Sequence, residues 1–283
     1  LIDSSTYSND VIKELLKDLN TILCECFEAI QGSKFILSKT DEINVIKQYC
    51  SMTDQKYNPK WSFVGPQPVS MGTEHLNPLN PNAIMSGYAV TEKADGVRAE
   101  LIIKDSKGYL ITPKKKVIGL GVTFETENSW IFDGEYITQN KKGEPIQLFM
   151  IFDVYYSSQQ PEQPNTLPWY SKKGVSRSGI IHEFKNTVPI TMNGNSCRIG
   201  FKQYFNGPEK LIEKDGKFKN LSSIMKYSKR ILDKELNLGG FEYFTDGLIF
   251  LPMFLPVKGT SEGESVKSIK GTWPLNYKWK PPE

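Results

Sequence analysis

Apolar residues recur at every third or fourth position near the start of the chain and fall into short runs farther along it. Over residues 10–30 this spacing predicts an amphipathic helix, with Asn9 or Asp10 as its cap and Gly32 as its stop. A shorter helix is expected at 41–49, where acidic residues occupy the first turn. Neither segment carries a catalytic constellation, so we expect this region to pack on the main domain or on a neighbour.

A proline-rich stretch separates these helices from a long series of predicted strands. Five prolines within residues 58–82 would interrupt any helix and predict an extended loop. Short apolar runs with turn residues between them then predict antiparallel strands. The expected strands cover 99–103, 109–112, 130–137, 147–155, 246–251 and 275–280. Helices are expected at 208–214 and 221–238, and the Gly-, Ser- and Lys-rich stretch 258–272 is expected to be mobile.

The composition suits a globular protein without a metal-binding cysteine motif. The chain has 283 residues, 39% of them hydrophobic, which allows one large domain or two ordinary ones. A net charge of +3 does not by itself indicate a nucleic-acid partner. Two histidines and four irregularly spaced cysteines argue against a zinc site and predict free thiols in a reducing compartment. No run is long enough to span a membrane, no signal peptide is expected, and the abrupt ends suggest a segment of a longer protein.

Lys93 is the first candidate for chemistry. It lies between two apolar runs, just before Asp95-Gly96, which we expect to form a tight turn because glycine tolerates positive φ. Arg98 follows the turn, so two cations are expected to point into one pocket. Crowded cations disfavour a protonated ammonium, which is one way to make a lysine nucleophilic. A solvated hairpin tip explains the same residues equally well, because short motifs match by chance.

Four further segments carry groups suited to phosphoryl or nucleotidyl transfer. They are Asp133-Gly134-Glu135, Phe152-Asp153, Asp246-Gly247 and Lys278-Trp279-Lys280. The two lysines of the last segment alternate, so both are expected on one face of a strand. Each segment alone is more often structural, as an Asp-Gly turn or an edge-strand lysine usually is. Together with Lys93 they combine a nucleophile, cations for phosphate, carboxylates for a divalent ion and an aromatic ring for stacking on a base.

In this order the segments closely resemble the motifs of the covalent nucleotidyltransferases, the superfamily of mRNA capping guanylyltransferases and ATP-dependent polynucleotide ligases. Residues 93–98 resemble the lysine motif of this superfamily, KxDGxR. The other matching segments are residues 132–135, 148–153, 246–250 and 278–280. The resemblance covers about residues 63 to 283, and five matches in the right order argue against chance.

Two details resemble the capping branch more than the ligases. The fourth motif begins with Asp246, where ligases typically have glutamate, and residues 63–71 resemble the segment that precedes the lysine motif in capping guanylyltransferases. The ending, residues 278–283, looks most like the large multifunctional capping enzymes of cytoplasmic DNA viruses. The alternatives are an ATP-dependent polynucleotide ligase and a degenerate RNA-binding or scaffold domain. Asp246 argues against the first, and the intact set of motif residues argues against the second.

The resemblance implies an α+β nucleotidyltransferase domain of twisted antiparallel sheets flanked by helices. This domain would cover residues 61–283, after a helical segment or linker at residues 1–60, and the family's C-terminal OB-fold domain is expected to be absent from this chain. The implied partners are GTP, 5′-diphosphate RNA, and triphosphatase, OB-fold and methyltransferase domains of the same longer polypeptide. The implied location is the cytoplasm, in a viral factory or virion, without a membrane anchor.

The resemblance also implies roles for single residues. Lys93 would attack the α-phosphate of GTP, release pyrophosphate and carry GMP as a phosphoamide until a 5′-diphosphate RNA end accepts it. The implied nucleotide-binding residues are Arg98, Glu135, Phe152, Lys278 and Lys280. Asp246 and Glu135 are the implied ligands of Mg²⁺ or Mn²⁺. The motif residues with an expected structural role are Asp95, Gly96, Asp133 and Gly134.

Overall fold

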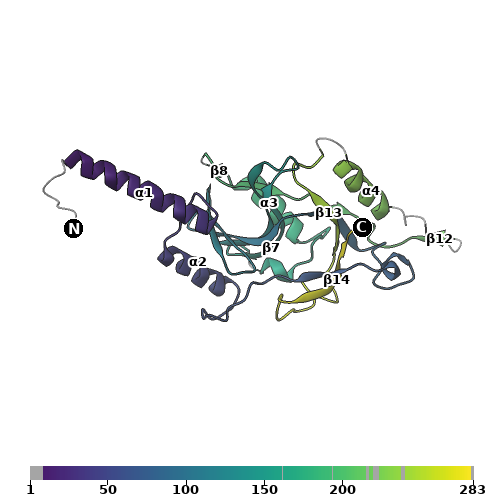
Figure 1. Ribbon diagram of the computed structural model, residues 1–283. Helices are drawn as coiled ribbons and strands as arrows, with labels where there is room; N and C mark the ends of the chain where they lie inside the picture. Colours follow the sequence, from purple (N-terminus) through teal and green to yellow (C-terminus); the bar gives the residue numbers. More distant parts are fainter. Residues whose placement is uncertain are drawn as a thin grey trace.

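The computed structural model of the protein describes residues 9–160, 162–192, 194–214, 217–218, 223–236 and 240–281. Its strands form two large twisted sheets flanked by helices (Figure 1). Within these sheets β1 pairs with β14 and β7 with β9 in parallel, whereas the other neighbours are antiparallel. The predicted α+β fold, with antiparallel sheets and flanking helices, is confirmed.

The larger sheet has seven strands in the order β8-β5-β4-β3-β6-β7-β9. They are β3 (Val97–Lys104), β4 (Lys107–Ile111), β5 (Val117–Phe124), β6 (Trp130–Gln139), β7 (Pro145–Ser157), β8 (Ile190–Met192) and β9 (Arg198–Phe201). The smaller sheet has five strands in the order β1-β14-β13-β2-β10. They are β1 (Gln67–Ser70), β2 (Tyr88–Ala94), β10 (Phe205–Asn206), β13 (Thr245–Pro252) and β14 (Thr272–Trp279). All six strands expected from apolar runs are present.

Four α-helices and two 3₁₀ turns accompany the sheets in the described part of the chain. They are α1 (Asn9–Gln31), α2 (Lys39–Met52), α3 (Arg177–Thr187), α4 (Ser223–Leu236), η1 (Thr73–Leu76) and η2 (Pro164–Thr166). The helices predicted at 10–30 and 41–49 are confirmed, as is 221–238 over the residues that are described. Residues 219–222 and 237–239 lie outside the described part. Helix α3 was not predicted, because only three of its residues are apolar, Ile180, Ile181 and Phe184, although these have helical spacing.

Two local predictions are wrong. No helix forms at 208–214, where β11 (Glu213–Lys214) instead pairs with β12 (Lys217–Phe218). The proline-rich stretch 58–82 is not all loop, since it contains η1 and β1, and β1 gains its partner from the far end of the chain in β14. Residues 258–271 hold no helix or strand, and the mobility of that stretch stays a prediction.

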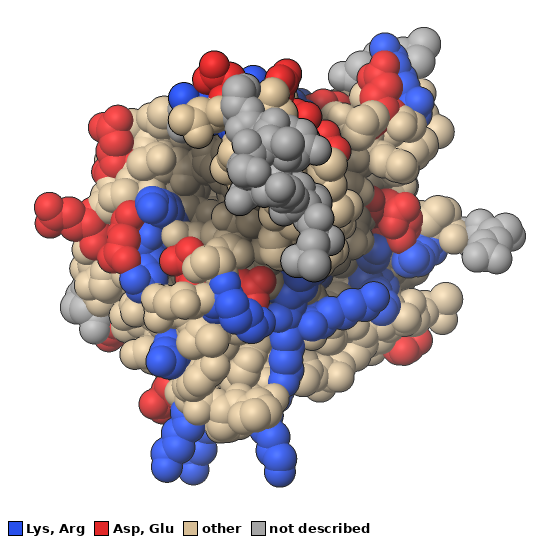
Figure 2. Space-filling model, turned by 60° about the vertical axis from the view of Figure 1, so that its left-hand side comes forward, with Lys and Arg blue, Asp and Glu red and all other residues tan. Residues whose placement is uncertain are grey.

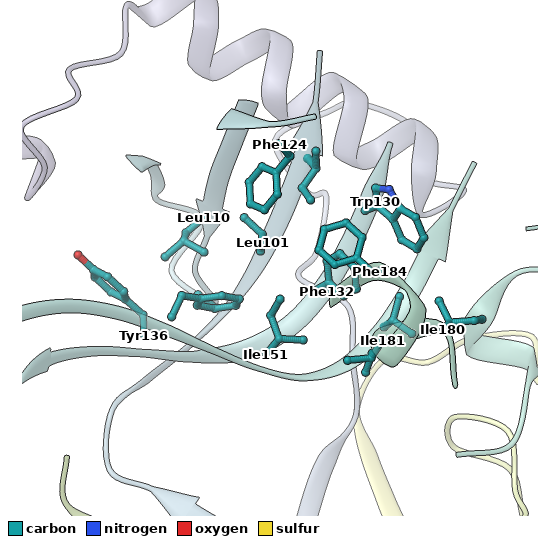
Figure 3. Packing of buried hydrophobic residues seen from close by; sticks show 14 of the residues in the cluster. Leu101, Leu110, Phe124, Trp130, Phe132, Tyr136, Ile151, Ile180, Ile181 and Phe184 are labelled. Atoms are coloured by element: carbon teal, nitrogen blue, oxygen red, sulfur yellow. The ribbon is translucent and has the colours of Figure 1, made fainter. Parts of the chain in front are cut away.

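The main core lies on one face of the seven-stranded sheet, under α3. Residues two apart on β6 point to the same face, so Trp130 and Phe132 stack on one another with their ring centroids 5.4 Å apart. Phe184 of α3 packs against both rings, at 4.6 Å from Phe132 and 5.0 Å from Trp130 (Figure 3). Burial of each such aromatic side chain contributes roughly 2–3 kcal/mol. This cluster fixes α3 and β6, and β6 carries three of the predicted site residues, Asp133, Gly134 and Glu135.

Helix α2 closes a second core on another part of the same sheet. Ser38 caps it, accepting a hydrogen bond from the amide of Asp41 at 3.1 Å. Val45, Tyr49 and Cys50 of α2 are buried in one cluster with residues of β3 and β4. The predicted packing of this helix on the main domain is confirmed. The division of the chain at residue 60 stays a prediction.

Helix α1 projects away from the rest of the molecule (Figure 1). None of its residues is buried, although one side of the helix is apolar. Its exposed large apolar side chains are Val11, Ile12, Leu15, Leu16, Leu19, Ile22, Leu23, Phe27 and Ile30. The expectation that this helix packs on the main domain is therefore wrong, and a contact with a neighbour stays a prediction.

Charge and polarity are unevenly distributed over the molecule. On the face drawn in Figure 2, basic side chains gather in a band across the middle, and many acidic ones lie toward the edges.

All four cysteines are free, as expected. Among the helices that the structure describes, none combines the length and the apolar character needed to cross a bilayer.

Candidate active site

The connection from β2 to β3 joins the two sheets and carries the lysine motif. β2 belongs to the five-stranded sheet and β3 to the seven-stranded one, so Asp95 and Gly96 link two sheets and do not form the tip of a hairpin. Gly96 does not have positive φ, so the prediction of a tight turn that needs glycine for its φ is wrong. A Cβ on Gly96 would lie 2.7 Å from the carbonyl oxygen of Tyr136. The motif therefore needs glycine for close approach of two backbones.

A cavity of about 190 Å³ lies between the two sheets, next to this connection. Both sheets contribute side chains to it, which is why no single stretch of sequence defines it. The predicted residues that line it are Lys93 of β2, Arg98 of β3, Asp133 and Glu135 of β6, Phe152 of β7 and Lys278 of β14. Lys93 and Arg98 thus border one pocket, as expected.

Lys93 forms an ion pair with Asp246. Its Nζ donates to Oδ1 of Asp246 at 2.6 Å, and the other oxygen, Oδ2, lies 2.6 Å from Nζ of Lys280. Burial tends to raise the pKa of Asp246, but hydrogen bonds from Lys280 and Lys93 outweigh this effect, so its pKa is lowered. The carboxylate of Asp246 therefore binds the ammonium groups of Lys93 and Lys280 together, an arrangement that we call the Asp246 clamp. The sequence does not predict this clamp, because the resemblance implies only metal binding for Asp246.

A break in strand pairing places Asp246 beside Lys93. β13 pairs with β2 from Thr245 to Pro252, and the register shifts between Thr245 and Leu248. Such a bulge turns side chains away from their regular alternation. Gly247, at φ +144°, occupies the bulge, and a Cβ there would lie 1.9 Å from the carbonyl oxygen of Trp279. In this motif, Gly247 is therefore required by the backbone of the bulge, and Asp246 supplies the carboxylate.

Arg98 is held by a buried carboxylate. Its Nε and Nη2 donate to the two oxygens of Asp133 at 3.0 and 2.6 Å, and the hydroxyl of Tyr155 donates to Asp133 at 2.5 Å. Burial favours the neutral form of Arg98, but the charges of Asp133 and Tyr155 and the hydrogen bond to Asp133 together outweigh it and raise the pKa of the guanidinium. Burial raises the pKa of Tyr155 well above its ordinary value. Most of the charge of Arg98 is thus already balanced within the protein.

Arg98 also anchors the segment that resembles the capping branch. Its Nη1 donates to the carbonyl oxygen of Pro66 at 3.0 Å, and its guanidinium lies 5.6 Å from the centroid of the Phe63 ring. Gly65 has φ +90°, and a Cβ there would lie 2.5 Å from Nη2 of Arg98. The segment at residues 63–71 is therefore packed directly onto the lysine motif.

Glu135 and Phe152 border the cavity together with a lysine that the sequence did not point out. Burial raises the pKa of Glu135, and the charges of Lys202 and Lys93 oppose that rise. Nζ of Lys202 lies 5.4 Å from the centroid of the Phe152 ring and donates to the carbonyl oxygen of Glu92 at 3.1 Å. The backbone amide of Lys202 bonds to Ile151, which brings residue 202 next to β7. No local pattern around Lys202 could have indicated this position.

Other predicted motif residues have structural surroundings. Asp153 is buried against Arg177 of α3, whose Nε donates to it at 2.8 Å. Asp95 has an exposed side chain, and its amide donates to the carbonyl oxygen of Phe244 at 2.9 Å. Lys280 follows the last residue of β14 and meets the site through Asp246. A Cβ on Gly134 would lie 2.3 Å from the Phe149 ring.

The described residues contain no group of three or more His, Cys, Asp or Glu side chains that could hold a metal ion. Magnesium is usually bound through one or two carboxylates, with water and substrate phosphates completing its shell. Glu135 fits that chemistry, because it lines the cavity. Both oxygens of Asp246 are engaged by ammonium groups, so an ion bound there would compete with Lys93 and Lys280.

Two known proteins resemble this chain in sequence. A probable mRNA-capping enzyme of Acanthamoeba polyphaga mimivirus is 25% identical over 299 aligned residues, covering 94% of this chain and 24% of that protein. An mRNA-capping enzyme of Danio rerio is 32% identical over 108 residues, covering 35% of this chain and 17% of that protein. The chain therefore spans about a quarter or less of the relatives that it matches.

Among solved structures, mycobacterial DNA ligase D complexed with ATP and MES resembles the chain with a TM-score of 0.45 and 11% identity. That similarity covers 77% of this chain and 60% of the ligase chain, and at this level it does not identify a substrate. The catalytic domain of mRNA capping enzymes matches residues 28–270, which include the lysine motif and Asp246. This chain belongs to the mRNA capping enzyme family, through its catalytic domain.

Proposed function

We propose that this chain is an mRNA guanylyltransferase that transfers GMP from GTP to the 5′-diphosphate end of RNA through Lys93. The observation that supports this most is the position of Lys93, whose Nζ is oriented by Asp246 at a cavity that also contains Arg98 and Lys278. A lysine nucleophile with cations around an enclosed phosphate site suits nucleotidyl transfer. Family membership implies a nucleotide substrate and a divalent metal.

In the first step, Nζ of Lys93 forms a bond to the α-phosphorus of GTP as the bond to the bridging oxygen breaks and pyrophosphate leaves. The ammonium of Lys93, which is partly exposed, must first pass a proton to solvent water, and Asp246 fixes the direction of its Nζ. Lys278 and Lys280 would balance phosphate charge, and the ring of Phe152 would stack on guanine. Glu135 would hold a divalent ion, Mg²⁺ or Mn²⁺, which supplies further charge neutralisation when bound. Asp246 would join it as a ligand by releasing Lys280 and keeping its contact with Lys93. In the second step, an oxygen of the RNA diphosphate takes the GMP and frees Lys93.

The wider setting belongs to the same proposal. The similarity to the mimivirus protein, of which this chain covers 24%, supports a place within a larger viral capping enzyme. Triphosphatase, OB-fold and methyltransferase domains would then be partners in one polypeptide, and the cytoplasm, in a viral factory or virion, would be its location.

The test is covalent labelling of the protein by α-labelled GTP with Mg²⁺ or Mn²⁺, followed by a denaturing gel. We expect GTP to label the protein far better than ATP. Lys93→Ala and Lys93→Arg should both abolish the label, because arginine keeps the charge but cannot become a free base. Preferential labelling by ATP would assign the chain to the ligases, and an adduct on Lys93→Arg would exclude Lys93 as the nucleophile.

A further inference from the structure

A second, larger groove adjoins the Lys93 cavity. It has a volume of about 720 Å³ and lies between α4 and the chain around β9 and β10. Lys202 borders both the groove and the cavity, and Glu92, the neighbour of Lys93, also lines the groove. We propose that this groove binds the single-stranded RNA that follows the 5′ end of the acceptor. This proposal rests on the guanylyltransferase function proposed above and specifies where its second substrate lies.

One face of α4 supplies most of the positive charge. Lys226, Lys229, Arg230 and Lys234 recur at helical spacing and all line the groove. On the other face of the helix, Ile224, Ser228 and Ile231 are buried. The helix therefore has one side that packs on the sheet and one side that presents cations to the groove. A helix of 14 residues is about 21 Å long, enough for several phosphates of an extended strand.

These cations are not balanced by neighbouring carboxylates. Among the described residues, no acidic side chain forms an ion pair with any of the four. Of the acids that line the groove, Glu92 is buried and accepts from Tyr243 at 2.9 Å, and Glu242 pairs with Arg198. Asp233 is the remaining acid on the groove wall. The groove therefore has a net positive charge available to a polyanion.

Aromatic rings lie among these cations. The guanidinium of Arg230 is 5.5 Å from the centroid of the Phe205 ring, and Nζ of Lys234 is 4.3 Å from that of Phe241. Phe205 is stacked on Tyr227 of α4 at 5.3 Å. Cations along a backbone path together with rings on which bases stack are characteristic of sites for single-stranded nucleic acid. An acidic peptide would use the cations but would have no need of the rings, so we favour RNA.

The direction of α4 connects the groove to the chemistry. The helix packs along β2: Ile224, near its start, is buried in one cluster with Tyr88 and Val90. Lys234, near its end, lies over Phe241, which packs in a cluster with Ala94, the residue after Lys93. Glu92 of β2 faces the groove, whereas its neighbour Lys93 faces the cavity, so a strand laid along α4 would reach this end of β2 and enter the cavity beside Lys202, which borders both. In this arrangement the 5′ end of an RNA bound in the groove would enter the cavity that contains Lys93.

The test separates RNA binding from adduct formation. The first variant is Lys226→Glu/Lys229→Glu, since both side chains are exposed. Its matched control is Lys107→Glu/Lys114→Glu, which makes the same change of charge at exposed positions on and after β4. Phe241→Leu tests the rings. The readouts are fluorescence anisotropy with a labelled 5′-diphosphate oligoribonucleotide across a salt series, single-turnover GMP transfer to that RNA, and GTP labelling of the protein.

We expect the α4 variant to bind RNA at least tenfold more weakly. The slope of log K against log salt concentration should become shallower by about 0.7 for each phosphate that the variant no longer neutralises. Phe241→Leu should weaken binding about tenfold, and the control should change it less than twofold. Labelling by GTP should stay within twofold of wild type in all three. Unchanged RNA binding by the α4 variant would overturn the proposal. The same anisotropy experiment with a labelled phosphorylated acidic peptide tests a protein partner. If the α4 variant lost binding to the peptide but bound RNA like wild type, the groove would serve a protein and the proposal would be overturned.

The two proposals fail separately. If the wild-type protein formed no GMP adduct, guanylyl transfer would be excluded, and the anisotropy experiment would still decide whether α4 binds RNA. If adducts formed normally and the α4 variant bound and capped RNA like wild type, the groove assignment alone would be wrong.

Discussion

At the scale of single residues, the site depends on carboxylates that hold cations in place. Asp246 joins Lys93 and Lys280, and Asp133 joins Arg98 and Tyr155. Each carboxylate fixes the direction of a group that the resemblance assigns to GTP. Orientation of this kind matters because a misplacement of about 1 Å in a reacting group can cost about 100-fold in rate.

Asp246→Asn tests this role. Asparagine keeps the size of the side chain but loses the charge that attracts both lysines, so we expect the rate of GMP-adduct formation to fall about 100-fold. Single-turnover labelling at saturating GTP measures that rate. Glu242→Gln, which removes a carboxylate from an exposed ion pair with Arg198, is the control and should label normally. A variant that labels at the wild-type rate would exclude the clamp.

The pH dependence of stability gives an independent check on the same residue. The pKa of Asp246 is lowered in the folded protein, so its ion pairs contribute stability above the ordinary aspartate value of about 3.9. That contribution is lost as pH falls through the lower folded value. Because the site is partly exposed, we expect it to be about 1 kcal/mol or less. Urea denaturation at pH 7 and pH 3 measures this effect. The difference in free energy of unfolding between wild type and Asp246→Asn should be smaller at pH 3.

At the scale of elements, the two N-terminal helices behave differently although both were predicted from the sequence. Tyr49 of α2 is buried, and its hydroxyl donates to Glu100 at 2.6 Å and accepts from the amide of Val64 at 2.8 Å. Burial raises the pKa of Glu100 well above its ordinary value, and the charge of Asp133 adds to this. Helix α2 therefore supports the strand that carries Arg98, whereas α1 buries none of its residues.

Tyr49→Phe should destabilise the protein by about 1–3 kcal/mol, because it leaves a buried carboxyl and a buried amide without a partner. Urea denaturation measures the change. Tyr57→Phe is the matched control, since Tyr57 is 47% exposed and the same hydroxyl is lost to solvent there. Equal stability of the two variants would show that the Tyr49 hydrogen bonds contribute nothing.

Leu16→Glu/Leu23→Glu on α1 should change the free energy of unfolding by less than about 0.5 kcal/mol, because these side chains are 59% and 47% exposed and support no core. The same variant should reduce binding of a hydrophobic dye. A loss of stability comparable to that of a core substitution would mean that α1 packs on the body in solution.

At the scale of the whole molecule, the cavity exists because two sheets meet at the β2–β3 connection. Lys93 and Arg98 are five residues apart, yet they sit on different sheets and face the same space. Where the chain enters the seven-stranded sheet, this connection passes close to β6, and Gly96 makes that approach possible.

Gly96→Ala should therefore displace the connection from Tyr136, cost about 1–3 kcal/mol and lower the rate of adduct formation. Thermal unfolding and GTP labelling measure the two effects. Gly174→Ala is the control, because a Cβ there would lie 3.4 Å from its nearest neighbour and its φ is not positive. If both alanine variants behaved like wild type, the close approach of the connection to β6 would not require glycine at position 96.

The sequence by itself determined the periodic helices, the six apolar strands and the order of the motif segments. These features depend on neighbours within a few residues, or on a resemblance carried by residue identity. Five prolines correctly indicated a break in helical structure, but they could not reveal that β1 pairs with a strand some 200 residues away. Likewise, the amphipathic pattern of α1 predicted a helix and could not say what, if anything, covers it.

Only the tertiary structure decided which groups meet. The ion pair between Lys93 and Asp246 joins residues 153 positions apart, and it depends on a bulge that no local pattern reveals. Lys202 reaches the cavity because β9 leads it along β7, and Arg98 is balanced by Asp133 because β3 pairs with β6. The basic face of α4 forms one wall of a groove because the chain around β9 and β10 lies opposite it, and the sequence of α4 alone does not show this. Residue types set the available chemistry, whereas strand register and the meeting of two sheets set the distances at which that chemistry can act.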